Sequence, residues 1–313
     1  MVIYEYPFKQ KTNIPECVLA LGFFDGVHIA HRDLLETARR EALERNISFG
    51  VFTFSAASNI KDGTARLYTD ADKAEIFETL GANFVIFADF PEISGASAEK
   101  FVKKMLREDL NCQLCVAGFN FRFGKGAKAG ADDLARLMSE SGGETVIREE
   151  IKGDGGETLS ATLIRELITS GEIKKANRLL GSPYNIKGRV LHGRAVGRDM
   201  GFPTLNIQIA EGRIIPRLGV YASALKIDGK AYLGVTNIGV CPTFKERAVH
   251  IETHVLDYEG DLYGRELRVF LLDFLREEKA FSSPEELKMQ ILVDKNTVIK
   301  ENGDIKWQEL GLK

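Results

Sequence analysis

The sequence has few cysteines, no long apolar run and no large excess of charge. Its four cysteines, Cys17, Cys112, Cys115 and Cys241, are too few and too scattered for a disulfide framework. Cys112 and Cys115 have C-x-x-C spacing, but no second ligand pair accompanies them. We therefore expect buried strand cysteines rather than a zinc site, and a reduced, cytoplasmic protein.

No apolar stretch approaches the length of a membrane span, and residues 1–10 lack the basic-then-apolar pattern of a signal peptide. The 42 Lys and Arg against 45 Asp and Glu give a net charge of −3. Such a charge attracts neither nucleic acid nor an anionic membrane, so we expect neither as a partner. The 313 residues leave room for two globular domains with ample cores.

The first half of the chain alternates short apolar runs with amphipathic segments. This alternation predicts βαβ units, which build a parallel sheet covered by helices on both faces. Such a sheet binds ligands at the carboxyl ends of its strands, where the first strand-to-helix turn presents free backbone N–H groups. The expected strands are 17–22, 48–54, 84–87 and 114–117, and the expected helices start at His28, Asp70 and Ala98.

The first strand-to-helix turn carries two histidines. His28 and His31 are three residues apart at the start of a predicted helix, so they can share one face. There they could donate hydrogen bonds to a triphosphate and stabilise the charge on a departing pyrophosphate. The alternative is a pair of surface histidines without a catalytic role.

The sequence changes character after two predicted helices, 162–169 and 173–180. Six short runs then follow without intervening helices, which predicts a small antiparallel β-barrel closed off by a terminal helix over 284–295. We therefore expect two domains, 1–183 and 184–313. The predicted barrel strands are 186–191, 205–209, 219–227, 230–238, 250–256 and 266–275.

A glycine- and proline-rich stretch, residues 197–206, leads into the second of these strands. If a strand opens here, Thr204 and Asn206 point to the same face. A Thr hydroxyl and an Asn carbonyl are hard oxygen donors that can hold Mg²⁺ while substrate phosphates supply the remaining ligands. The alternative is an ordinary Gly-Pro turn that enters a strand.

Alternation along 250–255 places His250, Glu252 and His254 on one face of a strand. A carboxylate in this position could take the proton from a substrate hydroxyl that attacks a γ-phosphate. Phosphoryl transfer otherwise needs mainly positioning and a metal ion. The alternative is a solvated outer strand face.

The segment 22–31 resembles the nucleotidyltransferase superfamily with a His-x-Gly-His signature, in particular the adenylyltransferase half of bacterial bifunctional riboflavin kinase/FAD synthetases. Segments 118–124 and 160–165 resemble that family's flavin-side and Ser-Ser-Thr-x-Ile-Arg motifs. The resemblance implies a Rossmann-like fold and flavin contacts at Asn120, Phe121 and Phe123. It implies ATP contacts at Gly22, Phe23, Asp25, His28, His31, Ser160, Thr162 and Arg165.

The sequence departs from the family pattern at several positions. Ala30 replaces the signature glycine, and Asn120 stands where many members have Asp. Residues 54–58 replace a common Phe-Asp-Pro-His-Pro stretch, so an acidic residue and a histidine are missing, and Ala161 replaces a serine. These departures leave open a kinase whose N-terminal site has an impaired adenylyltransferase activity.

The second half resembles riboflavin kinases over its whole length, including the stretches 201–206, 252–254 and 262–264. The resemblance implies that Glu252 is the general base on the ribityl 5′-hydroxyl and that Thr204 and Asn206 bind Mg²⁺. It implies flavin contacts at Asn237 and Arg276. It also implies ATP contacts at Gly193, Gly197, Arg198, Gly201, Pro203, Thr204 and Asn206.

The resemblance therefore implies an enzyme that phosphorylates riboflavin with MgATP and then transfers AMP from ATP to FMN, giving FAD and pyrophosphate. Its substrates would be riboflavin, FMN and ATP, with Mg²⁺ as the metal. A non-catalytic flavin or nucleotide sensor is the alternative from another class, and Glu252 argues against it because a sensor needs no base. Oligomeric state stays open.

Overall fold

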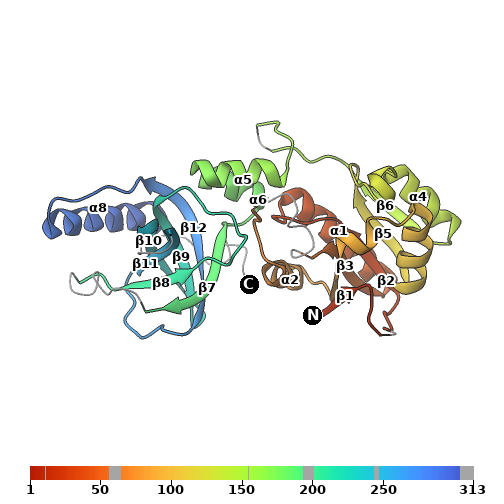
Figure 1. The fold of residues 1–313 in the computed structure, drawn as a ribbon, viewed down its shortest axis with the longest axis horizontal. Helices are drawn as coiled ribbons and strands as arrows, with labels where there is room; N and C mark the ends of the chain where they lie inside the picture. The colour runs from red at the N-terminus through yellow and green to blue at the C-terminus, as the bar shows by residue number, and fades with distance from the viewer. Residues whose placement is uncertain (11, 56–64, 154, 193–200, 243–246, 304–313) are drawn as a thin grey trace. The chain divides into compact units, whose positions relative to one another are not determined.

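The computed structural model describes residues 1–10, 12–55, 65–153, 155–192, 201–242 and 247–303. The chain folds as two compact units, Met1–Ser160 and Ala161–Lys313 (Figure 1). Among the described residues, no helix is long and apolar enough to span a membrane.

The first unit is built on a six-stranded parallel sheet in the order β1-β4-β3-β2-β5-β6. Its strands are β1 (Val2–Tyr6), β2 (Cys17–Leu21), β3 (Ser48–Phe54), β4 (Phe84–Ala88), β5 (Cys112–Gly118) and β6 (Glu144–Arg148). Its helices are α1 (Ile29–Arg45), α2 (Asp70–Thr79), α3 (Phe90–Ile93), the π-helix η2 (Lys100–Asp109), the 3₁₀-helix η3 (Lys125–Ala127) and α4 (Ala131–Glu140). The predicted parallel sheet is confirmed.

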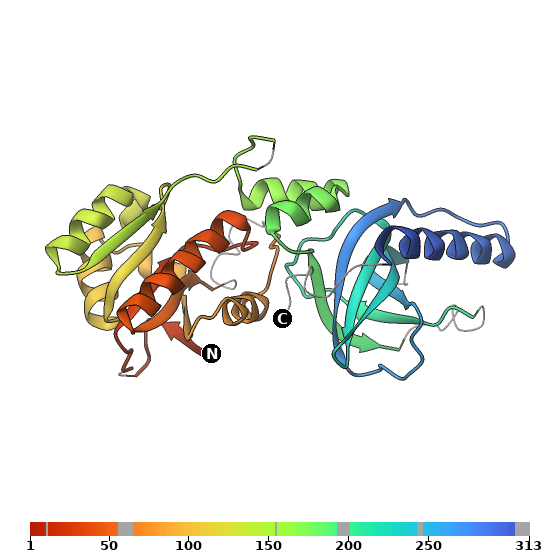
Figure 2. The same ribbon diagram turned by 180° about the vertical axis from the view of Figure 1, so that it is seen from behind.

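Helices cover both faces of this sheet. All five residues of β2 are buried, because Leu19 packs toward η2 and α4 whereas Val18 packs toward α1 and α2. Figure 2 shows α1 lying across one face of the sheet. The order of the strands reverses between β2 and β5, since the chain runs from β2 to β3 and β4 on one side and from β5 to β6 on the other. Ligands of open α/β sheets bind at such a point, outside the carboxyl ends of the strands.

The second unit is a closed antiparallel barrel in the order β10-β11-β8-β7-β12-β9, which confirms the predicted six-stranded barrel. Its strands are β7 (Asn185–Leu191), β8 (Thr204–Gln208), β9 (Gly219–Ile227), β10 (Lys230–Pro242), β11 (Arg247–Val255) and β12 (Glu266–Arg276). Its helices are α5 (Ala161–Ser170), α6 (Ile173–Leu180) and α8 (Pro284–Asn302). The terminal helix was predicted to end at residue 295 and is longer by about two turns.

The helices α5 and α6, which the sequence assigned to the first domain, belong to the second compact unit. Asn177 of α6 explains this packing, since its Nδ2 donates to Leu271 O of β12 (2.9 Å) and its Oδ1 accepts from Tyr184 N (2.7 Å). A domain boundary after residue 183 stays a prediction.

The barrel centre contains a chain of three buried hydroxyls. Thr236 Oγ1 lies 2.7 Å from Ser223 Oγ and 2.9 Å from Thr253 Oγ1, and all three residues are fully buried. Buried polar groups are tolerated when they hydrogen-bond to one another. Thr236 of β10 is the shared hydrogen-bond partner of Ser223 on β9 and Thr253 on β11.

We expect Thr236→Val to lower the free energy of unfolding of the barrel by about 1–3 kcal/mol, because the other two hydroxyls lose their shared partner while the shape is kept. Urea unfolding followed by circular dichroism measures the change. Thr297→Val is the matched control, since Thr297 bonds Val293 O on the exposed side of α8. Equal stability of the two variants would contradict the role given to Thr236.

Candidate active sites

The pairing register of β8, β10 and β11 brings the predicted polar residues of the barrel together. Across β8 and β11, Asn206 lies opposite Glu252 and Thr204 lies opposite His254. Across β11 and β10, Glu252 lies opposite Asn237. Residues directly opposite in an antiparallel pair share one face with Cβ atoms about 4.5–5.5 Å apart. These five side chains therefore form one polar group on three adjacent strands.

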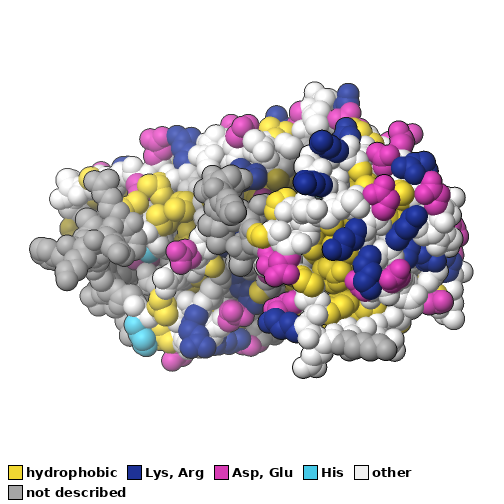
Figure 3. All heavy atoms as spheres, turned by 45° about the vertical axis from the view of Figure 1, so that its right-hand side comes forward, with side chains coloured by type: hydrophobic (Ala, Val, Ile, Leu, Met, Phe, Trp, Pro, Cys, Tyr) yellow, Lys and Arg dark blue, Asp and Glu magenta, His cyan; other side chains and the backbone are white. Residues whose placement is uncertain are grey.

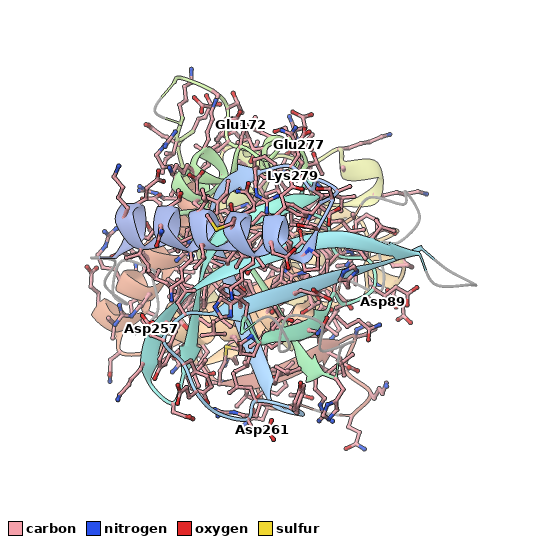
Figure 4. All side chains as sticks on the ribbon, turned by 90° about the vertical axis from the view of Figure 1, so that its left-hand side faces the viewer. Asp89, Glu172, Asp257, Asp261, Glu277 and Lys279 are labelled. Atoms are coloured by element: carbon pink, nitrogen blue, oxygen red, sulfur yellow. The ribbon has the colours of Figure 1, made fainter. Side chains whose placement is uncertain are left out.

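This polar group lies on the outer face of the barrel. The alternate residues Leu205, Ile251 and Thr253 are buried toward the interior. Glu252 and Asn206 are only partly buried and point the other way. The helix α8 crosses the outer face, as Figure 4 shows, with Glu277 and Lys279 on one side of the helix and Asp261 on the other. The site thus lies between the outer surface of the barrel and α8, and not inside the barrel.

Two cavities meet at Thr204. The first, here named the helix cavity, has a volume of about 240 Å³ and lies between the outer barrel face and α8. The second, here named the loop cavity, has a volume of about 370 Å³ and lies beside the segment 258–263. The helix cavity is lined by Thr204, Asn237, Glu252, His254, Arg276 and Asp294, among others. The loop cavity is lined by Pro203, Thr204, Val190, Asp261, Leu262 and Tyr263, among others.

The guanidinium of Arg276 is held at the wall of the helix cavity by Asp294 of α8. Its Nη2 donates to Asp294 Oδ2 at 2.7 Å, and its Nε lies 3.1 Å from both carboxylate oxygens. Gln290 Nε2 also donates to Asp294 Oδ1 at 2.8 Å. Asp294 is 4% exposed, so this fork-like pairing of a buried carboxylate fixes both α8 and the arginine.

His254 lies beneath the segment that precedes β8. Its Nδ1 is 3.0 Å from Pro203 O, and its ring meets Phe202 edge-on. A carbonyl oxygen only accepts, so Nδ1 carries the proton. Burial lowers the pKa of His254 below its usual value, and the bond to Pro203 opposes that shift. The imidazole is therefore neutral near pH 7.

In the first unit, the turn between β2 and α1 has an unusual backbone. Phe24 (φ 52°) and Val27 (φ 43°) both adopt positive φ angles, as does Gly26 (φ 88°). For a β-branched residue such as Val27 this region is a genuine outlier. Such conformations cost about 1–3 kcal/mol each and cluster at functional sites, because the surrounding structure must impose them. These backbone conformations therefore set the direction in which the chain enters α1.

His28 and His31 share one face at the start of α1, as their spacing predicted, and their rings stack on each other. Their ring centroids are 3.7 Å apart at an angle of 15°. His28 is the N-cap, and its Nδ1 accepts a hydrogen bond from His31 N at 3.4 Å. Since Nδ1 accepts, the neutral ring carries its proton on Nε2, where it can donate to a ligand.

Burial keeps both histidines neutral. It lowers the pKa of His28 to about 4, and it holds the pKa of His31 well below the usual value, with His28 as a further cause. Within the described part of the chain, the buried His31 Nδ1 has no hydrogen-bond partner. In the tautomer that carries its proton on Nδ1, His31 would donate to a phosphate oxygen of a ligand at the start of α1.

The other predicted residues of this turn hold it in place. Asp25 is 7% exposed, and its Oδ1 accepts from Leu67 N at 3.2 Å. Phe23 is exposed, and its carbonyl accepts from the Thr53 hydroxyl at 2.9 Å. Lys73, which the sequence did not single out, is 3% exposed and donates to Phe54 O at 3.0 Å. Asp25 thus ties the turn to Leu67, and the Lys73 ammonium lies 5.9 Å from the centroid of the Phe23 ring.

The predicted flavin-side residues of the first unit differ in their surroundings. Asn120 is exposed just after β5, and β5 pairs with β2, the strand that precedes the turn with His28. Phe121 is partly buried against the sheet, and Phe123 is 6% exposed and packs on Phe101. Phe123 therefore contributes to the core, and its contact with flavin stays a prediction.

Other predicted ligands lie elsewhere or outside the described residues. Ser160 precedes α5, and Thr162 and Arg165 lie on α5 in the second unit, so their ATP contacts stay predictions. Gly193, Gly197 and Arg198 lie outside the described residues, as do residues 56–58 of the departing segment. Gly22 directly follows β2, and Gly201 and Pro203 precede β8.

The described residues contain no group of three or more His, Cys, Asp and Glu suited to a metal. Cys112 and Cys115 are buried and free, as expected for strand cysteines. On the face shown in Figure 3, Lys and Arg side chains are interspersed with Asp and Glu. This pattern agrees with the small net charge of the sequence.

Comparison with known proteins gives two family matches. The model described as riboflavin kinase matches residues 180–301, and the model described as FAD synthetase matches residues 10–163. A bifunctional riboflavin kinase/FMN adenylyltransferase from Listeria monocytogenes is 36% identical over 284 residues, covering 88% of this chain and 90% of that protein. A protein of the same description from Bacillus subtilis is 34% identical over 299 residues, covering 93% and 94%.

A solved structure shares the fold. It is described as a macrolide-efflux protein from Streptococcus pneumoniae and aligns with a TM-score of 0.86 at 27% identity, covering 95% of this chain and 99% of that chain. The description names an activity that neither family model names, and it is a statement about that protein alone.

The histidine pKa values predict how stability changes with pH. The pKa of His28 is about 4 in the folded chain and 6.5 in the unfolded chain, so between these values the unfolded chain binds more protons. The free energy of unfolding should therefore fall as the pH is lowered from 7 to 4, by up to about 3 kcal/mol from this residue.

Urea unfolding at pH 7 and pH 5 measures this loss. We expect His28→Asn, which keeps a good N-cap, to lose less stability between the two pH values than the unchanged chain. An identical loss in both proteins would show that His28 is not buried in its neutral form.

Proposed function

Because the chain belongs to the family of bifunctional riboflavin kinase/FMN adenylyltransferases, we propose that the outer face of β8, β10 and β11 is its kinase site and the turn after β2 its adenylyltransferase site. The enzyme phosphorylates riboflavin to FMN with ATP. It then transfers AMP from a second ATP to FMN, which gives FAD and pyrophosphate.

The observation that carries the kinase assignment is the placement of Glu252 directly opposite Asn206. In the proposed step, Glu252 takes the proton of the ribityl 5′-hydroxyl as that oxygen attacks the γ-phosphorus of ATP. The bond between the γ-phosphorus and the β,γ-bridging oxygen breaks, and ADP leaves. A carboxylate within reach of the hydroxyl proton is suited to this role.

The side chains of Thr204 and Asn206 fit Mg²⁺ on the same face. Both are partly exposed beside Glu252, and neither has a side-chain hydrogen bond to another described residue, so their oxygens are available. We propose that Thr204 Oγ1 and Asn206 Oδ1 hold the ion. When bound, Mg²⁺ would neutralise negative charge on the ATP phosphates.

We propose that the two cavities hold the two substrates of the kinase step. Riboflavin would occupy the helix cavity, where Glu252, Asn237 and Arg276 lie, and ATP would occupy the loop cavity. Thr204 lines both, so the transferred phosphoryl group would pass beside it. The ribityl 5′-hydroxyl would then point from the helix cavity toward Thr204.

In the adenylyltransferase site, the start of α1 would bind the phosphates of ATP. A phosphate oxygen of FMN attacks the α-phosphorus, the bond to the bridging oxygen breaks, and pyrophosphate leaves. His28 Nε2–H and the His31 ring would stabilise the charge that develops on the leaving group. Ala30 lies in the first turn of α1 between them, and the helix forms with it in place.

A cytoplasmic location is also part of this proposal. Cys17, Cys112 and Cys115 are free thiols, and burial raises the pKa of Cys17 and Cys115 to about 12. Free thiols persist in a reducing compartment, where ATP is also abundant.

Glu252→Gln tests the base directly. We expect it to lower the rate of FMN formation by about 10²–10⁴-fold, because the amide keeps the shape but cannot take the proton. Chromatographic separation of riboflavin and FMN measures the rate, and FAD formation from added FMN serves as the control. Near-normal phosphorylation in this variant would remove Glu252 as the base.

The combined change His28→Ala with His31→Ala tests the second site. We expect FAD formation from FMN to fall by at least about 10²-fold, since two donors to the leaving group are lost. FMN formation from riboflavin should stay unchanged in the same preparation. An unaltered rate of FAD formation would refute the role of the two histidines.

A further inference from the structure

The amide of Asn237 is held in one orientation by Glu278. Asn237 Nδ2 donates to Glu278 Oε1 at 3.0 Å. A carboxylate only accepts hydrogen bonds, so the NH₂ group of Asn237 must face Glu278 and Oδ1 must face away from it. This one hydrogen bond thereby fixes the direction in which Asn237 Oδ1 points.

Asn237 Oδ1 is buried and has no hydrogen-bond partner in the part of the chain that the structure describes. A buried acceptor left without a donor costs about 1–3 kcal/mol. Asn237 lines the helix cavity. A ligand in the helix cavity that carries a hydroxyl or an N–H group would donate to Asn237 Oδ1 and remove this cost.

The close approach of Glu278 depends on Gly239. Asn237 and Gly239 are two residues apart on β10 and so lie on the same face. A Cβ on Gly239 would overlap Glu278 Oε1. The bare backbone at Gly239 thus provides the space in which the carboxylate of Glu278 rests beside Asn237.

The position of Asn237 indicates which donor its oxygen meets. Asn237 lies directly opposite Glu252 across β10 and β11. Their Cβ atoms are therefore about 4.5–5.5 Å apart, so both side chains can reach the same short ribityl chain. If Glu252 faces the 5′-hydroxyl, the neighbouring acceptor faces the next part of the ribityl chain rather than the distant flavin rings.

We propose that Glu278 is a positioning residue of the kinase site: it orients the amide of Asn237 so that Oδ1 accepts a hydrogen bond from a ribityl hydroxyl of riboflavin. The inference rests on the proposed function. Glu278 does not touch the reacting atoms, and its effect passes through Asn237. The contact aligns the ribityl chain with the proton acceptor Glu252.

The test compares riboflavin with lumiflavin, which has the same three rings and a methyl group in place of the ribityl chain. Dissociation constants come from quenching of flavin fluorescence by the full chain. We expect Glu278→Ala to weaken riboflavin binding about threefold to tenfold, the size of one net hydrogen bond. Lumiflavin binding should stay within about twofold, because lumiflavin lacks the donor.

Glu277→Ala is the matched control. Glu277 precedes Glu278, carries the same charge and pairs with Arg217 instead, so its loss should change the dissociation constant of neither flavin. The pair Glu278→Ala and Asn237→Ala should not be additive: the double variant should bind riboflavin as weakly as Asn237→Ala alone. FAD formation from FMN reports that each protein preparation is folded in its other unit.

Unchanged riboflavin binding in Glu278→Ala, with weaker binding in Asn237→Ala, would overturn the inference and leave the proposed flavin site standing. Equal weakening of riboflavin and lumiflavin would also overturn it, because the amide would then face the rings. Unchanged binding in Asn237→Ala would remove Asn237 from the flavin site and contradict that part of the proposed function.

Discussion

The pairing register of β8, β10 and β11 is the constraint on which the kinase site depends. Side chains alternate across a strand, so a slip of one residue would turn Asn206 or Glu252 into the barrel and bring its neighbours out. The buried hydroxyls of Thr236 and Thr253 oppose such a slip, since they find each other only in this register. Interior packing thus determines the arrangement of the outer, functional face.

The two sites of this chain use burial for different ends. At the start of α1, burial keeps His28 and His31 neutral, so that they act as hydrogen-bond donors that carry no charge before the substrate arrives. On the barrel, the buried Asp294 of α8 instead fixes a charged partner, Arg276, at the wall of the helix cavity. The cost of removing the Asp294 carboxylate from water is offset by its hydrogen bonds to the Arg276 guanidinium. These bonds also fix the position of Arg276 in the helix cavity.

Sequence patterns predicted the four interior strands of the first sheet but missed its two edge strands and the helix α4. The strand β2 is buried on both faces and was predicted. The edge strands β1 and β6, whose residues are mostly exposed or partly buried, gave no clear pattern, and α4 was missed although it buries Leu134, Leu137 and Met138. Alternation correctly predicted that Thr204 and Asn206 share one face of β8 and that Glu252 and His254 share one face of β11. Glu278 had no sequence signal, because its role comes from the approach of the segment after β12 to the bare backbone of Gly239, which is a matter of tertiary packing.

The central claim is that one chain carries two working sites for consecutive steps on the same flavin. The most direct test is a time course with the full chain, riboflavin, ATP and Mg²⁺, in which the flavins are separated by chromatography. The account predicts that FMN rises first and is then converted to FAD. FMN that accumulates without FAD would contradict a working site at His28 and His31, and the absence of any phosphorylated flavin would contradict the kinase site as well.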